Sequence, residues 1–469
     1  MYTFIMSVIL LLVGYAVYGK IVENNFDVDN LRLTPSQRMN DGVDYIEMSW
    51  PRAFLIQFLN IAGTGPIFGA VAGALWGPAA FLWIVFGSIF GGAVHDYLSG
   101  MISLRHDGAS VTEIIGEYLG ENVRKVVTIF SLMLLVLVGA VFITSPALIL
   151  TDVTGIGKNI WVGIIIAYYL IATVLPVDKV IGKIYPIFGA SLLVMAVGIF
   201  GGMIFTGKIA AIPEFNFTNL HPKAVPIFPF LFISIACGAI SGFHSTQSPM
   251  MARCIKTEKD GFRVFYGSMI MEGLVALIWA AIAMCFFPGG ITGLAGAGAA
   301  GVVVNKVSMG MLGKVGGILA LLGVVACPIT TGDTAFRSAR LIVGDFLKFN
   351  QGPVKNRFIV AVPLFVLAVG LTFVDFTIIW RYFAWANQTL AIFPLWVGAN
   401  YLYKREKAYL IAMIPAMFMT TVTTTYILQA KEGFGIPTNI ALLMGILITV
   451  GATAVFYKKN MAYRAAQEA

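Results

Sequence analysis

Long apolar runs separated by short polar stretches make up most of this chain. Crossing a bilayer as a helix takes about 20 mainly apolar residues, and runs near or above that length recur from end to end. This pattern predicts an all-α polytopic membrane protein with about 13 transmembrane helices. The predicted spans are roughly residues 2–19, 51–76, 78–103, 125–150, 160–176, 184–206, 226–250, 263–288, 314–342, 357–374, 376–402, 408–429 and 438–457.

Two of these runs are interrupted by residues that disfavour a continuous helix. Residues 60–66 read Asn-Ile-Ala-Gly-Thr-Gly-Pro, and residues 237–249 contain two glycines and end in proline. Proline removes a backbone donor, and glycine lowers the cost of unwinding. A kinked but continuous helix is the alternative, because both residues are common in membrane helices. Paired breaks in two halves are the best sequence indication of a transporter's binding site, so we expect two discontinuous helices there.

Small and polar residues at these breaks are the candidates for binding substrate. Glycines allow close approach to the backbone, and the start of a half-helix offers free N–H groups that suit a carboxylate. For His244 the alternative is a hydrogen bond to a carbonyl freed by the break. For Asn387 and Gln388 it is hydrogen bonding between helices. The predicted substrate-binding residues are Asn60, Gly63, Thr64, Gly65, Ser241, Gly242, His244, Ser245, Gln247, Asn387 and Gln388.

Charge is scarce and its distribution carries topological information. Only 12% of residues are charged and the mean hydropathy is +0.86, which leaves no room for a sizeable soluble domain. If the loop after the first span is cytoplasmic, 24 of the 31 Lys and Arg residues fall on the cytoplasmic side and six outside. This bias predicts an outer N-terminus and a cytoplasmic C-terminus. The net charge of +8 therefore indicates topology and not nucleic-acid binding.

That topology divides the chain into two halves of opposite orientation. Each half has five spans and begins with a broken helix, which is the plan of an inverted repeat. We expect a first helix with a cytoplasmic loop, then the two repeats with an outer loop between them, and finally two extra helices with a short cytoplasmic tail. The corresponding ranges are 1–50, 51–206, 207–225, 226–402 and 403–469. The first helix is expected to be retained and not cleaved as a signal peptide.

Ionisable and hydroxyl groups within the spans are candidates for carrying a coupling ion. Glu272 and the pair His95 and Asp96 are costly at membrane depth and could relay a proton, or could be hydrogen-bonded structural groups. Thr330 and Thr331 offer oxygen ligands for Na⁺, although threonines beside a proline also bond back to their own helix. Asp333 lies near them and is expected to pair with Arg337, four residues on.

Other cofactors and other classes of function find little support in the sequence. The four cysteines lack metal-ligand or disulfide spacing, and no metal site is predicted beyond the possible Na⁺ site at Thr330 and Thr331. No phosphate-binding P-loop motif is present, and the four histidines are scattered, so a membrane enzyme is disfavoured. A channel stays open as an alternative. The expected partners are a small-molecule substrate and the lipid bilayer, and the sequence does not decide the oligomeric state.

Five segments together resemble the carbon starvation protein A family of bacterial inner-membrane transporters. They are IAGTGP at 61–66, GGAVHDYLSGMISLRHDGASVTEIIGEYLG at 91–120, SGFH at 241–244, TTGDTAFRSAR at 330–340 and WANQTLA at 385–391. The resemblance implies uptake of peptides or pyruvate during nutrient limitation by alternating access, coupled to H⁺ or Na⁺. It also implies the five-plus-five inverted repeat of the amino acid–polyamine–organocation superfamily, the LeuT-like fold. Many family members are longer, so this chain is a compact form.

Overall fold

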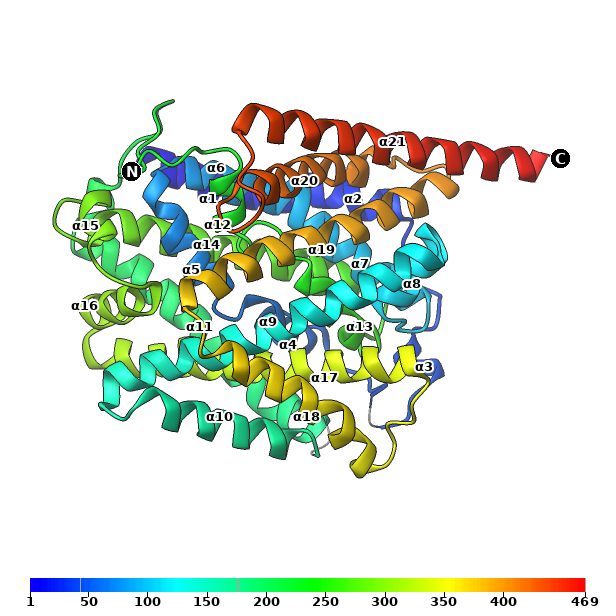
Figure 1. Cartoon of the computed structure of the whole chain (residues 1–469), viewed down its shortest axis with the longest axis horizontal. Helices are drawn as coiled ribbons and strands as arrows, with labels where there is room; N and C mark the ends of the chain where they lie inside the picture. Colours follow the sequence, from blue (N-terminus) through cyan, green and yellow to red (C-terminus); the bar gives the residue numbers. More distant parts are fainter. Residues whose placement is uncertain (43, 175–176, 469) are drawn as a thin grey trace.

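The computed structural model describes residues 1–42, 44–174 and 177–468, and within them the regular secondary structure is helical apart from one isolated bridge. The helices run side by side in one bundle (Figure 1). The α-helices are α1 (Tyr2–Ala16), α2 (Tyr18–Phe26), α3 (Pro35–Arg38), α4 (Trp50–Ala62), α5 (Gly65–Gly73), α6 (Ala79–Phe86), α7 (Ala93–Arg105), α8 (Val111–Leu119), α9 (Glu121–Thr154), α10 (Lys158–Ala172), α11 (Val177–Phe205), α12 (Phe230–Ser234), α13 (Phe243–Ala252), α14 (Gly267–Phe286), α15 (Ile291–Ala295), α16 (Ala300–Ala320), α17 (Cys327–Leu347), α18 (Val354–Leu371), α19 (Phe376–Lys404), α20 (Leu410–Gln429) and α21 (Thr438–Glu468).

Membrane-length helices account for most of the predicted spans. Among the described residues, nine helices are long and apolar enough to cross a bilayer, and the bent pair α4–α5 makes a tenth. Three other predicted spans correspond to α10 with 15 residues, to the short helices α12 and α13, and to α19 with 29 residues. The model thus confirms an all-helical membrane protein, while the count of thirteen and the inverted repeat stay predictions.

One candidate span contains two helical parts. Residues 300–347 include α16, a π-helical segment and α17, and within α16 the backbone is non-helical at Gly313, with φ +57° and ψ −142°, a conformation that residues with side chains rarely adopt. The predicted span 314–342 begins directly after this break, so the helical part before Gly313 is an element that the hydrophobic pattern did not predict. Two further π-helical segments, at residues 87–92 and 262–266, adjoin α7 and α14. Such segments are frequent at functional sites.

The two chain termini lie at opposite ends of the bundle (Figure 1). The amino group of Met1 pairs with Glu214 at 2.6 Å, so the loop after α11 lies at the N-terminal end. Near the other terminus, Lys459 Nζ donates to the carbonyl of Leu119 at 2.8 Å. The side of the membrane on which each terminus lies stays a prediction.

Helix α8 shows how local sequence sets an element boundary. The Ser110 side chain accepts a hydrogen bond from the Glu113 N–H, and the Glu113 side chain bonds back to the Ser110 N–H. This reciprocal pair satisfies two donors that a helix start leaves free. The helix then packs on α9 and α19, so α8 is a short helix lying against the bundle.

Candidate functional site

The first predicted break is present between α4 and α5. Helix α4 ends at Ala62, α5 begins at Gly65, and the two bend by 48°. Gly63 adopts φ +44° and ψ −139°, which strongly favours a residue without a β-carbon. Pro66 occupies the first turn of α5, where its missing N–H costs nothing. The glycines and the proline therefore act as the sequence predicted.

The second break is present and shorter than predicted. Helix α12 ends at Ser234, residues 235–242 are not helical, and α13 begins at Phe243. The predicted interruption extended to residue 249, but residues 243–249 belong to α13. His244, Ser245 and Gln247 consequently project from a helix and not from an unwound segment.

The two breaks pack directly against each other. A β-carbon added to Gly65 would lie 2.3 Å from both Cβ and Sγ of Cys237, and one added to Gly238 would lie 3.6 Å from Cα of Pro66. A β-carbon at Gly242 would lie 2.4 Å from the backbone nitrogen of Ala391. In this conformation the glycines accommodate neighbouring protein, whereas the sequence suggested that they leave room for substrate.

Two amides of α19 hold the second break in place. Asn387 accepts hydrogen bonds at its side-chain oxygen from Ser241 Oγ at 3.0 Å and from the Phe243 N–H at 2.8 Å, and its carbonyl accepts from the Gly242 N–H. Gln388 Nε2 donates to the carbonyl of Phe232 at 2.6 Å. The amides thus bond groups that the break leaves without helical partners. A role in contacting substrate stays a prediction for both residues.

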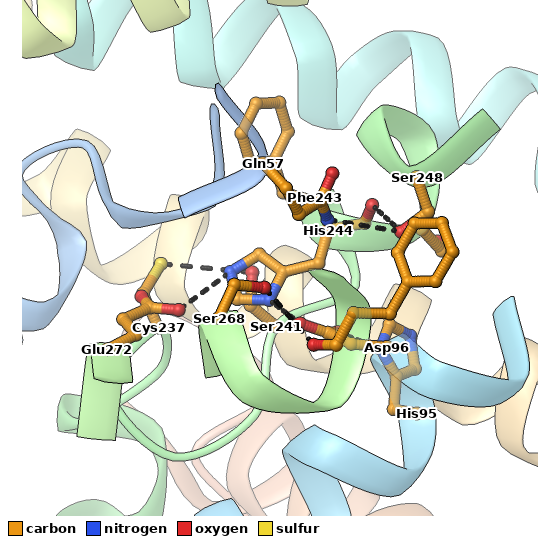
Figure 2. Close-up of polar contacts among 12 residues, drawn as sticks. Gln57, His95, Asp96, Cys237, Ser241, Phe243, His244, Ser248, Ser268 and Glu272 are labelled. Atoms are coloured by element: carbon orange, nitrogen blue, oxygen red, sulfur yellow. Dashed lines mark hydrogen bonds and ion pairs between the residues drawn. The ribbon is translucent and has the colours of Figure 1, made fainter. Parts of the chain in front are cut away.

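Four ionisable side chains form a continuous buried chain between α7, α13 and α14 (Figure 2). His95 Nδ1 and Asp96 Oδ1 are 2.8 Å apart, and Asp96 Oδ2 lies 2.8 Å from His244 Nδ1. His244 Nε2 lies 3.4 Å from Glu272 Oε2. All four side chains have no solvent exposure. His244 therefore faces two carboxyl groups and not the freed carbonyl that was the alternative for it. A proton-carrying role for His95, Asp96 or Glu272 stays a prediction.

Several other buried polar atoms near the breaks have no hydrogen-bond partner among the described residues. They belong to Asn60 on both side-chain atoms, to the Thr64 hydroxyl and to the Gln247 side-chain oxygen. Ser245 differs, because its hydroxyl donates to the Gly242 carbonyl at 2.6 Å. Buried polar groups are nearly always hydrogen-bonded, so unpaired ones in a core mark positions where a ligand, an ion or water can bind.

The predicted sodium ligands bond to backbone carbonyls. Thr330 Oγ1 donates to the Cys327 carbonyl at 2.7 Å, and Thr331 Oγ1 contacts the carbonyls of Cys327 at 3.0 Å and of Leu59 at 3.2 Å. Bonding back to their own helix was the alternative stated for these threonines, and the Leu59 contact also ties α17 to the end of α4. Asp333 pairs with Arg337 at 3.9 Å, as predicted. Sodium ligation stays a prediction.

Sequence reasoning missed one residue of the buried cluster, Cys237. Its sulfur lies within 4.8 Å of ligand atoms of both His244 and Glu272. Isolated cysteines in apolar runs usually behave as small buried hydrophobic residues, so nothing in the local pattern singled it out. Its position as the first residue of the predicted break was the available signal.

Comparison with known proteins places the chain in a family. The family model described as Carbon starvation protein CstA matches residues 1–154 and 146–295. The chain belongs to the CstA family. It is 44% identical to a Haemophilus influenzae protein described as an uncharacterized membrane protein, over 61% of this chain and 91% of that protein.

Two relatives in Escherichia coli K12 carry functional names. The peptide transporter CstA is 25% identical over 91% of this chain and 81% of its own length. The pyruvate/proton symporter BtsT is 27% identical over 60% of this chain and 49% of its own length. This CstA-family chain thus spans about half of the symporter and most of the peptide transporter.

Solved structures agree on the fold. A manganese transporter from Eremococcus coleocola superposes with a TM-score of 0.54 at 10% identity, covering 90% of this chain and 97% of that one. At this identity the likeness concerns the arrangement of helices alone. Together with the apolar helices, the family membership makes this chain a multi-pass membrane protein.

Proposed function

We propose that this protein is a secondary transporter that takes up a small carboxylate solute, pyruvate or a short peptide, across the bacterial inner membrane by alternating access. The observation that carries the proposal is the meeting of two broken helices around buried polar groups without partners. The relatives named as a peptide transporter and a pyruvate/proton symporter support the substrate class. The helix α5 begins beside Thr64, and its first N–H groups suit a carboxylate.

The same proposal includes the finer architecture. Thirteen spans result if α10, the pair α12–α13 and α19 each cross the membrane, and the two broken helices then begin halves of opposite orientation. Ranges 51–206 and 226–402 would be the two repeats, with the N-terminus outside and the C-terminus in the cytoplasm. The bias of Lys and Arg supports this orientation.

Coupling to protons is proposed in preference to sodium. One relative is named as a proton symporter, and four buried ionisable side chains lie in contact between α7, α13 and α14. A pH gradient should therefore drive accumulation of solute into proteoliposomes, and replacing sodium by potassium at fixed pH should leave uptake unchanged. Sodium-dependent uptake that ignores the pH gradient would reverse this assignment.

Counterflow in proteoliposomes tests the transporter itself. Labelled pyruvate and a labelled alanyl dipeptide are each offered to vesicles preloaded with the unlabelled compound. Saturable exchange without an energy source supports a carrier, unsaturable flux supports a channel, and no flux of either solute contradicts the proposed substrates.

A matched pair of amide variants tests the location of the site. Asn60→Ala removes an unpaired buried amide at the first break and should raise the apparent KM at least tenfold, a change of about 1.4 kcal/mol. Asn400→Ala removes a buried amide that is already hydrogen-bonded to the Trp396 carbonyl and to Asn460. The control should lower thermal stability while leaving KM unchanged. Equal KM values for both variants would place the substrate elsewhere.

A further inference from the structure

Three side chains of metal-ligand type converge at the second break. Cys237 lies in the non-helical segment 235–242, His244 is in the first turn of α13, and Glu272 is on α14 (Figure 2). Their ligand atoms all lie within 4.8 Å of one another. The three residues are 3%, 0% and 0% exposed, so they form one buried constellation.

The spacing within this constellation suits an ion held between the ligands. His244 Nε2 and Glu272 Oε2 are 3.4 Å apart, whereas N–H···O hydrogen bonds in proteins are about 2.7–3.2 Å long. Nitrogen and oxygen ligands bound tetrahedrally to zinc at about 2.1 Å are about 3.4 Å from each other. The observed separation therefore matches one edge of a zinc coordination tetrahedron.

The residues behind the three ligands are those that metal sites use to orient them. Asp96 Oδ2 lies 2.8 Å from His244 Nδ1, the ring nitrogen that faces away from Glu272. A ligating histidine almost always donates its second ring N–H to a carboxylate or carbonyl, which fixes its tautomer. Asn387 Nδ2 lies 3.3 Å from Cys237 Sγ, where it supports a thiolate. His95 in turn holds the other oxygen of Asp96.

A second, independent observation points to a ligand at this position. His244 Nε2 and both carboxyl oxygens of Glu272 are buried and have no hydrogen-bond partner among the described residues. One ligand atom of each of these two residues lies within 4.8 Å of the other ligand atoms of the constellation. Burying a carboxyl group without a partner is costly, and a cation between the imidazole, the thiolate and the carboxylate removes that cost.

We propose that Cys237, His244 and Glu272 bind a divalent transition-metal ion, with Zn²⁺ as the best fit. Thiolate, imidazole and carboxylate together suit zinc better than they suit the hard ions Mg²⁺ or Ca²⁺. Three protein ligands leave a fourth coordination position open. The proposal goes beyond solute transport and depends only on this constellation.

Metal content of the purified protein tests the site. The full chain, carrying an affinity tag without histidine, is purified from cells grown with zinc, and zinc is measured by mass spectrometry against protein concentration. We expect about one zinc ion per chain, as one site requires. Cys237→Ser and Glu272→Gln should each lower zinc affinity at least tenfold. Cys285→Ser, which changes another buried cysteine outside the constellation, should bind as the wild type does.

Cobalt provides a spectroscopic readout of the ligands themselves. Co²⁺ bound to the wild-type protein should show a thiolate charge-transfer band and the strong visible bands of tetrahedral cobalt. Asp96→Asn should keep the band and weaken binding 10- to 100-fold, the effect expected for a residue that orients a ligand. Absence of zinc and of the band in the wild type, or identical binding by Cys237→Ser and Cys285→Ser, would overturn the proposal.

Counterflow measured on the same protein separates this proposal from the proposed function. Stoichiometric zinc with no solute exchange would leave the metal site standing and count against transport. Solute exchange by a protein that binds neither zinc nor cobalt would support transport and count against the metal site.

Discussion

At the scale of single residues, small side chains at the breaks determine how closely the two half-helices approach. A β-carbon on Gly238 would lie 2.5 Å from Cβ of Ala276 on α14 and 3.6 Å from Cα of Pro66. Contacts below 3 Å force one of the partners to move, and overpacking of this kind typically costs about 1–3 kcal/mol. Gly238 is therefore needed for packing, independently of any solute.

The first prediction tests this packing by exchanging the small residue between the second break and α14. Gly238→Ala should destabilise the protein by about 1–3 kcal/mol, and Ala276→Gly alone by about 1 kcal/mol, the cost of glycine within a helix. The double variant should lose less stability than the two single variants lose together, because removing the β-carbon at position 276 makes space for the one added at position 238. Thermal unfolding of all four proteins in detergent gives the coupling energy. Strictly additive losses would mean that the two positions are not in contact.

Sequence reasoning worked at this scale where a residue's effect is local. Gly63 and Pro66 act on their own backbone, so the first break could be located to within a few residues. The pairing of His244 with Asp96 and Glu272 could not be inferred, because it depends on how α7, α13 and α14 pack. Cys237 escaped notice for the same reason, since its approach to Glu272 and to Asn387 depends on how the second break packs on α14 and α19.

At the scale of elements, the buried carboxylate of Glu258 bonds to residues of two segments that are distant from it in sequence. Arg105, at the end of α7, contacts it with Nε at 3.0 Å and Nη2 at 2.8 Å, and the Asp29 N–H donates to it at 2.8 Å. Glu258 has no solvent exposure, and the Arg105 guanidinium also lies over the ring of Phe26. The pair thus fixes α7, the segment after α2 and the loop after α13 to one another.

The second prediction concerns the loss of this ion pair. Glu258→Gln should destabilise the protein by about 3–5 kcal/mol, because it leaves the Arg105 charge without a buried counterion. Glu117→Gln is the matched control, since the Glu117 side chain is 56% exposed and its contact with His106 is at the surface. Exposed pairs contribute at most about 1 kcal/mol. Equal shifts in unfolding temperature for the two variants would show that the buried pair has no special role.

Element boundaries were predictable where a motif marks them and less so elsewhere. The capping box of Ser110 and Glu113 marks the start of α8 in the sequence itself, because both side chains act within one turn. The second break was predicted too long because Pro249 was taken to end it, yet Pro249 lies inside α13. Hydrophobic runs alone also missed the helical part before Gly313, where Asn305 and Lys306 interrupt the apolar pattern.

At the scale of the whole molecule, the number of crossings depends on the α12–α13 pair. These helices have only 5 and 10 residues, so neither could span a bilayer alone. Their intervening segment is tolerated at membrane depth because α19 satisfies its backbone and the first break packs against it. If the pair crosses as one unit, three crossings separate the loop before α12 from the loop after α17, and those loops face opposite sides.

The last prediction is that cysteines in these two loops react from opposite sides of the membrane. The native background should be low, because all four native cysteines are buried. Phe217→Cys, at a position that is 97% exposed, should react with an impermeant thiol reagent in intact cells. Lys348→Cys, at the end of α17, should react only after the membrane is permeabilised.

Each labelling pattern has a distinct meaning. The Phe217 loop lies at the same end of the bundle as the N-terminus, so labelling of Phe217→Cys also reports the side on which the N-terminus lies. Labelling of both positions in intact cells would mean that α12–α13 does not cross, which would remove the odd number of crossings on which opposite-facing halves depend. The reverse pattern would keep the repeat and invert the orientation that the basic residues predict. In intact cells, labelling of Phe217→Cys without labelling of Lys348→Cys is the one pattern consistent with two inverted halves, an outer N-terminus and breaks that meet within the membrane.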